Sequence, residues 1–154
     1  MIHVDKIMLC TDFSDESKHA APYAIDLAEH YNAELQVIHV FDETALDPVF
    51  FSFEGSMSDF IRDFRENFAS KIEEFLSDFN TENIQIAPVL ANGSPFVEIV
   101  RYAKLNGIDF IVAGTHGRSG LSHMLLGSTA EKIIRKAHCP VLTVRNPEFE
   151  FEMP

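Results

Sequence analysis

The feature that most constrains this chain is a glycine-rich stretch that lies between an apolar run and a helical pattern. Residues 108–113 form the apolar run, and residues 130–137 have apolar side chains at helical spacing. The glycines between them are Gly114, Gly117, Gly120 and Gly127. This order predicts a buried strand, a loop and a helix.

The glycine spacing predicts a loop that binds phosphate. Gly114-x-x-Gly117 is followed by nine residues and then by Gly127 and Ser128. Glycine has no Cβ, so backbone N–H groups can approach a phosphate closely, and the helix that follows directs the positive end of its dipole toward the same place. The pattern is neither a P-loop nor the dinucleotide-binding G-x-G-x-x-G.

The same residues also fit an ordinary connection between a strand and a helix. Ser128 and Glu131 have the spacing of a capping box, which a helix start uses with or without a ligand. Gly117 and Gly120 are common turn residues. The spacing alone leaves the phosphate loop and the plain connection open.

The rest of the chain alternates between apolar runs and helical patterns. We expect strands at residues 6–11, 34–41, 82–90, 109–113 and 140–145. Helices are expected after Ser14, which is a plausible N-cap, and at 59–79, 95–106 and 130–137. The helix at 59–79 carries an apolar stripe that should face the core: Phe60, Phe64, Phe68, Ile72, Phe75, Leu76 and Phe79.

This alternation predicts an α/β fold, a single doubly wound, Rossmann-like domain at residues 1–146 with an acidic, aromatic tail at 147–154. We expect a five-stranded parallel sheet in the order 3-2-1-4-5, with helices on both faces. In such sheets a ligand lies outside the carboxyl ends of the strands, where the strand order reverses. Residues 11–12, residues 40–41 and Gly114 should meet there.

Composition excludes several classes of function. The formal net charge of −12 opposes nonspecific binding to nucleic acid or to an anionic membrane. No apolar run approaches the ~20 residues of a membrane helix. The chain has two cysteines and no signal peptide at its start, so we expect a cytoplasmic protein. Cys10 and Cys139 should lie at opposite ends of the sheet, which excludes a disulfide between them.

Two segments suggest contacts beyond the core. The apolar residues 49–53 interrupt an irregular stretch, and they fit either a flap on the core or an interaction patch or lid. The last strand, at 140–145, should be an edge strand, whose unpaired backbone groups favour a homodimer. The alternative is a monomer whose own tail, with Phe149 and Phe151, covers that edge.

Several motifs together resemble the universal stress protein family. They lie at residues 6–14, 39–40, 114–120, 127–132 and 138–145, so the resemblance runs in order from about Ile2 to Arg145. The family contains members that bind ATP and members that do not. The binders carry the G-x-x-G, nine-residue, G-[ST] pattern, and this sequence carries it intact.

The resemblance implies a nucleotide site and a role for each part of it. Thr11 and Asp12 would meet the ribose or a Mg²⁺ on the phosphates, with Phe13 beside them, and Val40 would contact adenine through its backbone. The remaining residues would line the phosphates or donate hydrogen bonds to them: Gly114, His116, Gly117, Arg118, Gly127, Ser128 and Thr129.

We therefore expect an ATP-binding module in stress response or signalling, with the nucleotide as a regulatory ligand and Mg²⁺ accompanying it. A slow ATP hydrolase or phosphotransferase is the first alternative, although His116 and His123 have no evident orienting partner in the sequence. A stress-response interaction protein that binds no nucleotide and works through residues 49–53 is the second. Many relatives dimerise through the strand at 140–145, so the resemblance also implies a homodimer.

Overall fold

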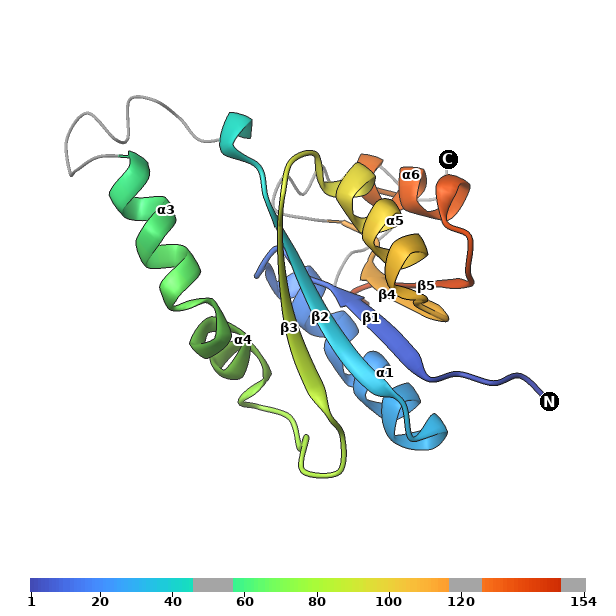
Figure 1. Cartoon of the computed structure of the whole chain (residues 1–154). Helices are drawn as coiled ribbons and strands as arrows, with labels where there is room; N and C mark the ends of the chain where they lie inside the picture. Colours follow the sequence, from blue (N-terminus) through green and yellow to red (C-terminus); the bar gives the residue numbers. More distant parts are fainter. Residues whose placement is uncertain (46–56, 117–125, 148–154) are drawn as a thin grey trace.

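Five parallel strands form the centre of the molecule. The computed structural model describes residues 1–45, 57–116 and 126–147. Its strands are β1 (Lys6–Cys10), β2 (Glu34–Phe41), β3 (Ile86–Asn92), β4 (Phe110–Gly114) and β5 (Val141–Val144). They lie in the order β3-β2-β1-β4-β5, and every neighbouring pair is parallel (Figure 1). The predicted fold class and strand order are confirmed.

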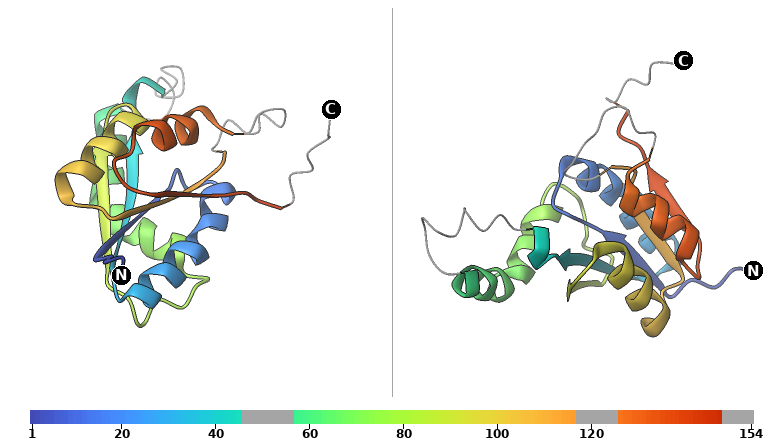
Figure 2. Two further views of the ribbon diagram at one scale, coloured as in Figure 1. Left: turned by 90° about the vertical axis from the view of Figure 1, so that its right-hand side faces the viewer. Right: turned by 90° about the horizontal axis from the view of Figure 1, so that it is seen from above.

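Helices cover both faces of this sheet. The helical segments are α1 (Asp15–Tyr31), η1 (Glu43–Ala45), α3 (Met57–Glu66), α4 (Phe68–Leu76), α5 (Pro95–Asn106) and α6 (Ser128–Lys136). Figures 1 and 2 show α1 and α4 on one face and α5 and α6 on the other. No helix in the described part of the chain is long and apolar enough to cross a membrane.

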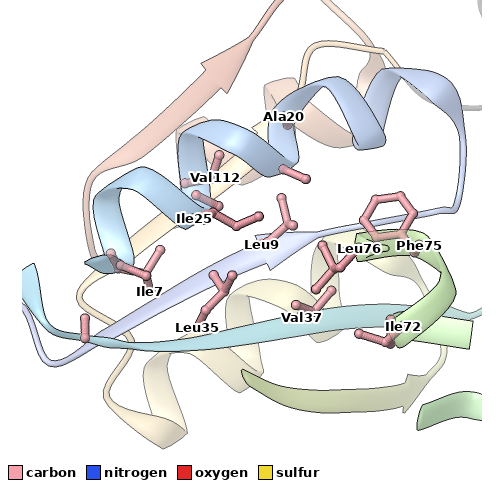
Figure 3. Close-up of a cluster of buried hydrophobic side chains, with 14 of the residues drawn as sticks. Ile7, Leu9, Ala20, Ile25, Leu35, Val37, Ile72, Phe75, Leu76 and Val112 are labelled. Carbon is pink, nitrogen blue, oxygen red and sulfur yellow. The ribbon is translucent and has the colours of Figure 1, made fainter. Parts of the chain in front are cut away.

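Two apolar clusters hold the helices to the sheet. On the α1 and α4 face, Leu9, Leu35 and Val37 of the strands pack against Ile25 and Ile72 of the helices (Figure 3). On the other face, Met8 and Ile111 pack against Ile99 of α5 and Ile133 of α6. Alternate residues of β1 and β2 therefore enter opposite clusters, as expected for strands that are buried on both faces.

The single helix predicted at 59–79 is wrong, because the structure divides it into α3 and α4 at Asn67. Asn67 has φ −100° and ψ 8°, outside the helical region. Its N–H still donates to the backbone oxygen of Asp63 at 3.1 Å, and its side-chain Nδ2 donates to the same oxygen at 2.9 Å. Of the predicted stripe, Phe68, Ile72, Phe75 and Leu76 are buried, whereas Phe60 in α3 is 40% exposed.

The strand predicted at 82–90 begins later, at Ile86, because a turn precedes it. Glu82 N–H donates to Oδ1 of Asn80, and Ile84 N–H donates to the oxygen of Thr81. Pro88 lies inside this strand and is tolerated there. Leu35 N–H donates to Gln85 O, so the odd-numbered residues of β3 face β2 and the missing N–H of Pro88 faces the open edge.

Candidate functional site

The carboxyl ends of β1, β2 and β4 surround a cavity of about 380 Å³, a size typical of ligand sites. Of the predicted site residues, the structure brings these to the cavity: Thr11, Asp12, Val40, Gly114, His116, Gly127, Ser128 and Thr129. Gly117 and Arg118 lie outside the described residues, as do residues 49–53 and 148–154.

The turn from β1 into α1 forms one wall, and hydrogen bonds within it fix its shape. The hydroxyl of Thr11 lies 2.9 Å from that of Ser17 and accepts the N–H of Phe13 at 2.9 Å. Oδ1 of Asp12 accepts the N–H of Ser14 at 3.0 Å and also its hydroxyl. Ser14 is the N-cap of α1, as predicted, and its hydroxyl accepts Ser17 N–H at 3.2 Å. The Thr11 hydroxyl is thus part of the turn itself.

Phe13 is the predicted site residue that the structure places elsewhere, since it does not line the cavity. Its backbone has φ 61°, which is unusual for a bulky residue. Its ring packs in an aromatic cluster, with ring centroids 4.9 Å from His39, 5.8 Å from Phe75 and 6.4 Å from Phe68. The role of Phe13 is therefore to anchor the turn, and aromatic packing compensates for its backbone conformation.

Val40 presents its backbone N–H and C=O to the cavity because β1 ends before it. The pairing of β1 with β2 ends at Cys10 and Ile38, and Thr11 N–H donates to Ile38 O at 2.9 Å. The next even-numbered residue of β2 is Val40, whose backbone groups point to the same side. Within the described residues they have no ladder partner. A donor and an acceptor on one residue match the paired acceptor and donor of a purine edge.

Gly114 and Gly127 are both required by close approaches between backbone segments. A Cβ on Gly114 would lie 2.9 Å from the carbonyl oxygen of Glu16 in α1. A Cβ on Gly127 would lie 3.0 Å from the oxygen of Thr115, and the N–H of Gly127 donates to that same oxygen at 2.6 Å. These two glycines bring α1, β4 and the start of α6 together around the cavity.

The start of α6 supplies backbone donors. Its N-cap is Gly127, with φ −67° and ψ 150° and no side-chain cap bond, so the capping box predicted at Ser128 is wrong by one residue. Ser128, Thr129 and Ala130 form the first turn and line the cavity, and their N–H groups have no acceptor within the helix. The helix dipole adds positive potential at this point. None of the described lining residues is Lys or Arg.

The opposite wall is apolar and was missed by sequence reasoning. Ile38, Ile99 of α5 and Ile133 of α6 contribute to it, together with Pro95 and Cys10. Burial, with a smaller contribution from Cys139, raises the pKa of the Cys10 thiol to about 12, so the thiol is neutral. Cys10 and Cys139 are both free, as predicted. The sequence signal for this wall was only that these residues lie at the ends of predicted strands or on the apolar faces of predicted helices.

Among the described residues that line the cavity, the acidic side chain is that of Asp12, and its chemistry fits Mg²⁺ bound through a nucleotide. Mg²⁺ in such sites is held by one or two carboxylates and by substrate phosphates, with water in the remaining positions. Asp12 supplies one carboxylate on the turn beside β4. Among the described residues no group of three His, Cys, Asp or Glu side chains could hold a metal ion without such a ligand.

Comparisons with known proteins agree with the fold. A model described as "Universal stress protein family" matches residues 3–145. Universal stress protein MJ0531 of Methanocaldococcus jannaschii is 36% identical over 148 residues, covering 94% of this chain and 84% of that relative. The solved structure of MJ0577 from the same organism has a TM-score of 0.71 at 29% identity and covers 94% of this chain and 98% of its own.

A more distant structure contains a nucleotide. The universal stress protein of Archaeoglobus fulgidus, solved in complex with dAMP, has a TM-score of 0.60 at 20% identity, covering 93% of this chain and 98% of its own. At this identity the likeness shows the fold alone.

Proposed function

The chain belongs to the universal stress protein family, and on this basis we propose that it binds ATP in the cavity at the carboxyl edge of its sheet as a regulatory ligand. The observation that carries the proposal is the arrangement of two sets of backbone donors around one cavity. Val40 offers a hydrogen-bonding edge at the end of β2, and the first turn of α6 offers N–H groups and a positive dipole.

Each part of the cavity suits one part of an adenine nucleotide. The apolar wall formed by Ile38, Ile99 and Ile133 suits the face of the base, and Val40 suits its hydrogen-bonding edge. Ser128 and Thr129 suit the phosphates, and Arg118, in the motif at residues 114–120, would add a cation there. Asp12 would hold Mg²⁺, whose chemistry is to neutralise the negative charge of the phosphates. The dAMP complex of the Archaeoglobus fulgidus relative is consistent with an adenine nucleotide.

We expect ATP to bind at least about tenfold more tightly than adenosine, because the donors at the start of α6 act on phosphate and not on the nucleoside. Mass spectrometry of the purified protein should find a co-purified adenine nucleotide, and calorimetry should compare ATP with adenosine. GTP is the matched control for the base, because its purine edge has the reverse donor and acceptor order at the position of the adenine amino group. Equal affinities for ATP and adenosine would contradict the phosphate assignment.

We also expect hydrolysis no faster than about one turnover per minute, far below the 1–10³ s⁻¹ of ordinary enzymes. Phosphoryl transfer needs charge compensation by several positioned cations, and the described lining residues include no Lys or Arg. A steady-state phosphate-release assay measures this rate. Several turnovers per second that disappear in Asp12→Asn, which keeps the acceptor for Ser14 but removes the charge, would instead identify a hydrolase.

We further propose that two copies associate through β5, which is an edge strand of the sheet. Ile111 N–H donates to Pro140 O, and Thr115 N–H donates to Val144 O, so the even-numbered residues of β5 face β4. The backbone groups of Val141 and Thr143 therefore face the open edge. Pairing of this edge with the same edge of a second copy, across a two-fold axis, would satisfy these groups.

A further inference from the structure

Where β1 leaves the sheet at the cavity, the side chain of His39 contacts the backbone of Thr11. If the β1–β2 ladder continued by one step, Val40 N–H would donate to Thr11 O. The Thr11 oxygen instead lies 2.9 Å from Nδ1 of His39. A carbonyl oxygen can only accept, so Nδ1 carries the proton and donates. The imidazole therefore uses one lone pair of the acceptor that would serve Val40 N–H in a continued ladder, and among the described residues Val40 N–H makes no bond to it.

We infer that His39 is a positioning residue for recognition of the base: by binding the Thr11 carbonyl it turns β1 out of the sheet and leaves Val40 N–H exposed to the cavity. This inference rests on the proposed function, because it concerns the part of the ATP site that contacts the base. Thr11 is buried, so its carbonyl needs a partner, and His39 supplies one from a neighbouring strand.

The ring of His39 is itself held in place by aromatic neighbours from the turn and from the α3–α4 pair. Its centroid lies 4.9 Å from that of Phe13, 5.5 Å from Phe64 in α3 and 6.4 Å from Phe68 in α4. Packing on several sides fixes the direction in which Nδ1 points. The α3–α4 pair, which lies beside the β3 edge in Figure 1, thereby supports the base end of the cavity.

Through the contacts of His39, the base end of the cavity and the α3–α4 pair are thermodynamically linked. A base that takes the Val40 N–H stabilises the arrangement in which His39 keeps the Thr11 carbonyl, and that arrangement requires Phe64 and Phe68 to stay packed on the imidazole. Such coupling is reciprocal, so a partner that moves α3 should also change affinity for the nucleotide.

Two substitutions separate the hydrogen bond of His39 from its ring. His39→Phe keeps an aromatic ring in the cluster but removes the donor. His39→Asn removes the ring but places an amide N–H at the position of Nδ1. In His39→Phe we expect Thr11 O to accept Val40 N–H instead, so affinity for ATP should fall at least about tenfold. His39→Asn should remain within about threefold of the unchanged chain.

Inorganic tripolyphosphate is the control ligand, because it reports the phosphate half of the site without a base. Its affinity should be the same in the unchanged chain and in His39→Phe, so only the advantage of ATP over tripolyphosphate is lost. Equal weakening of ATP binding in both variants would show that an amide donor does not replace Nδ1 and would overturn the inference. Weakening in His39→Asn alone would show that the ring acts through packing alone. Unchanged ATP binding in His39→Phe would overturn it as well.

Nuclear magnetic resonance of the unchanged protein provides a test that needs neither a variant nor a nucleotide. Nitrogen-15 spectra should show a proton on Nδ1 of His39, and the Val40 amide should exchange rapidly with solvent. An Nδ1 without a proton, or a Val40 amide protected like its neighbours in β2, would refute the positioning role. If the protein binds no ATP, the proposed function fails, and these spectra still decide whether His39 holds the Thr11 carbonyl.

Discussion

Gly114→Ala should lower the free energy of unfolding by roughly 3 kcal/mol, because the added methyl group has no space. Its Cβ would lie 2.9 Å from the carbonyl oxygen of Glu16 and 3.2 Å from the carbonyl carbon. Both atoms belong to the backbone of the first turn of α1, so relief requires a shift of the helix and not of one side chain. Urea denaturation with an unchanged m-value would measure the loss.

Gly107→Ala is the matched control for this substitution. Gly107 caps α5 with φ 65°, and a Cβ there would meet nothing within 4 Å. The cost is then only that of a left-handed backbone for alanine, about 1 kcal/mol. If both variants lose the same stability, the close approach of Glu16 to β4 is not the reason for the glycine at position 114.

Gly114 and Gly127 also show what the spacing of a motif can and cannot predict. The pattern placed Gly114 and Gly127 at one cavity, and they lie there. The sequence suggested that they allow a phosphate to approach the backbone, whereas the structure shows that they allow the backbone of Glu16 and that of Thr115 to approach. A glycine pattern indicates that another group packs closely against the backbone at that position. Which segment approaches the glycine depends on the fold.

The order and type of the strands could be predicted because each strand is apolar on both faces. The pattern at residues 34–41 matched β2 throughout. The periodicity at 59–79 failed at Asn67 because the change in backbone angles there, beside the side-chain bond to Asp63, does not change the spacing of apolar residues. Local hydrogen bonds of this kind leave the hydrophobic pattern intact, so such breaks are invisible to it.

In the sequence, His39 was only part of the motif at residues 39–40, and Phe13 was only a neighbour of the nucleotide. Their roles depend on Phe64 and Phe68, which are distant in sequence, and on the end of the β1–β2 ladder. No local sequence pattern indicates where the pairing of two strands ends. The convergence of Thr11, Val40 and Gly114 was predictable from topology, whereas the interactions that orient them were not.

Thr143→Pro should convert the proposed dimer to a monomer without unfolding it. The N–H of Thr143 faces the open edge of β5, so proline removes a donor to a second copy and none to β4. Light scattering at micromolar concentration should give twice 17.4 kDa for the unchanged chain and the single value for the variant.

Leu142→Pro is the control on the same strand, and it should act on the fold instead. The N–H of Leu142 faces β4, so proline removes a bond inside the sheet and its ring meets the neighbouring strand. We expect a loss of at least about 3 kcal/mol in the free energy of unfolding. The N–H groups of these adjacent residues face opposite edges of β5. The two variants together therefore distinguish an interface at the open edge from general damage to β5. A monomeric mass for the unchanged chain across the micromolar range would refute the dimer, whatever the two variants do.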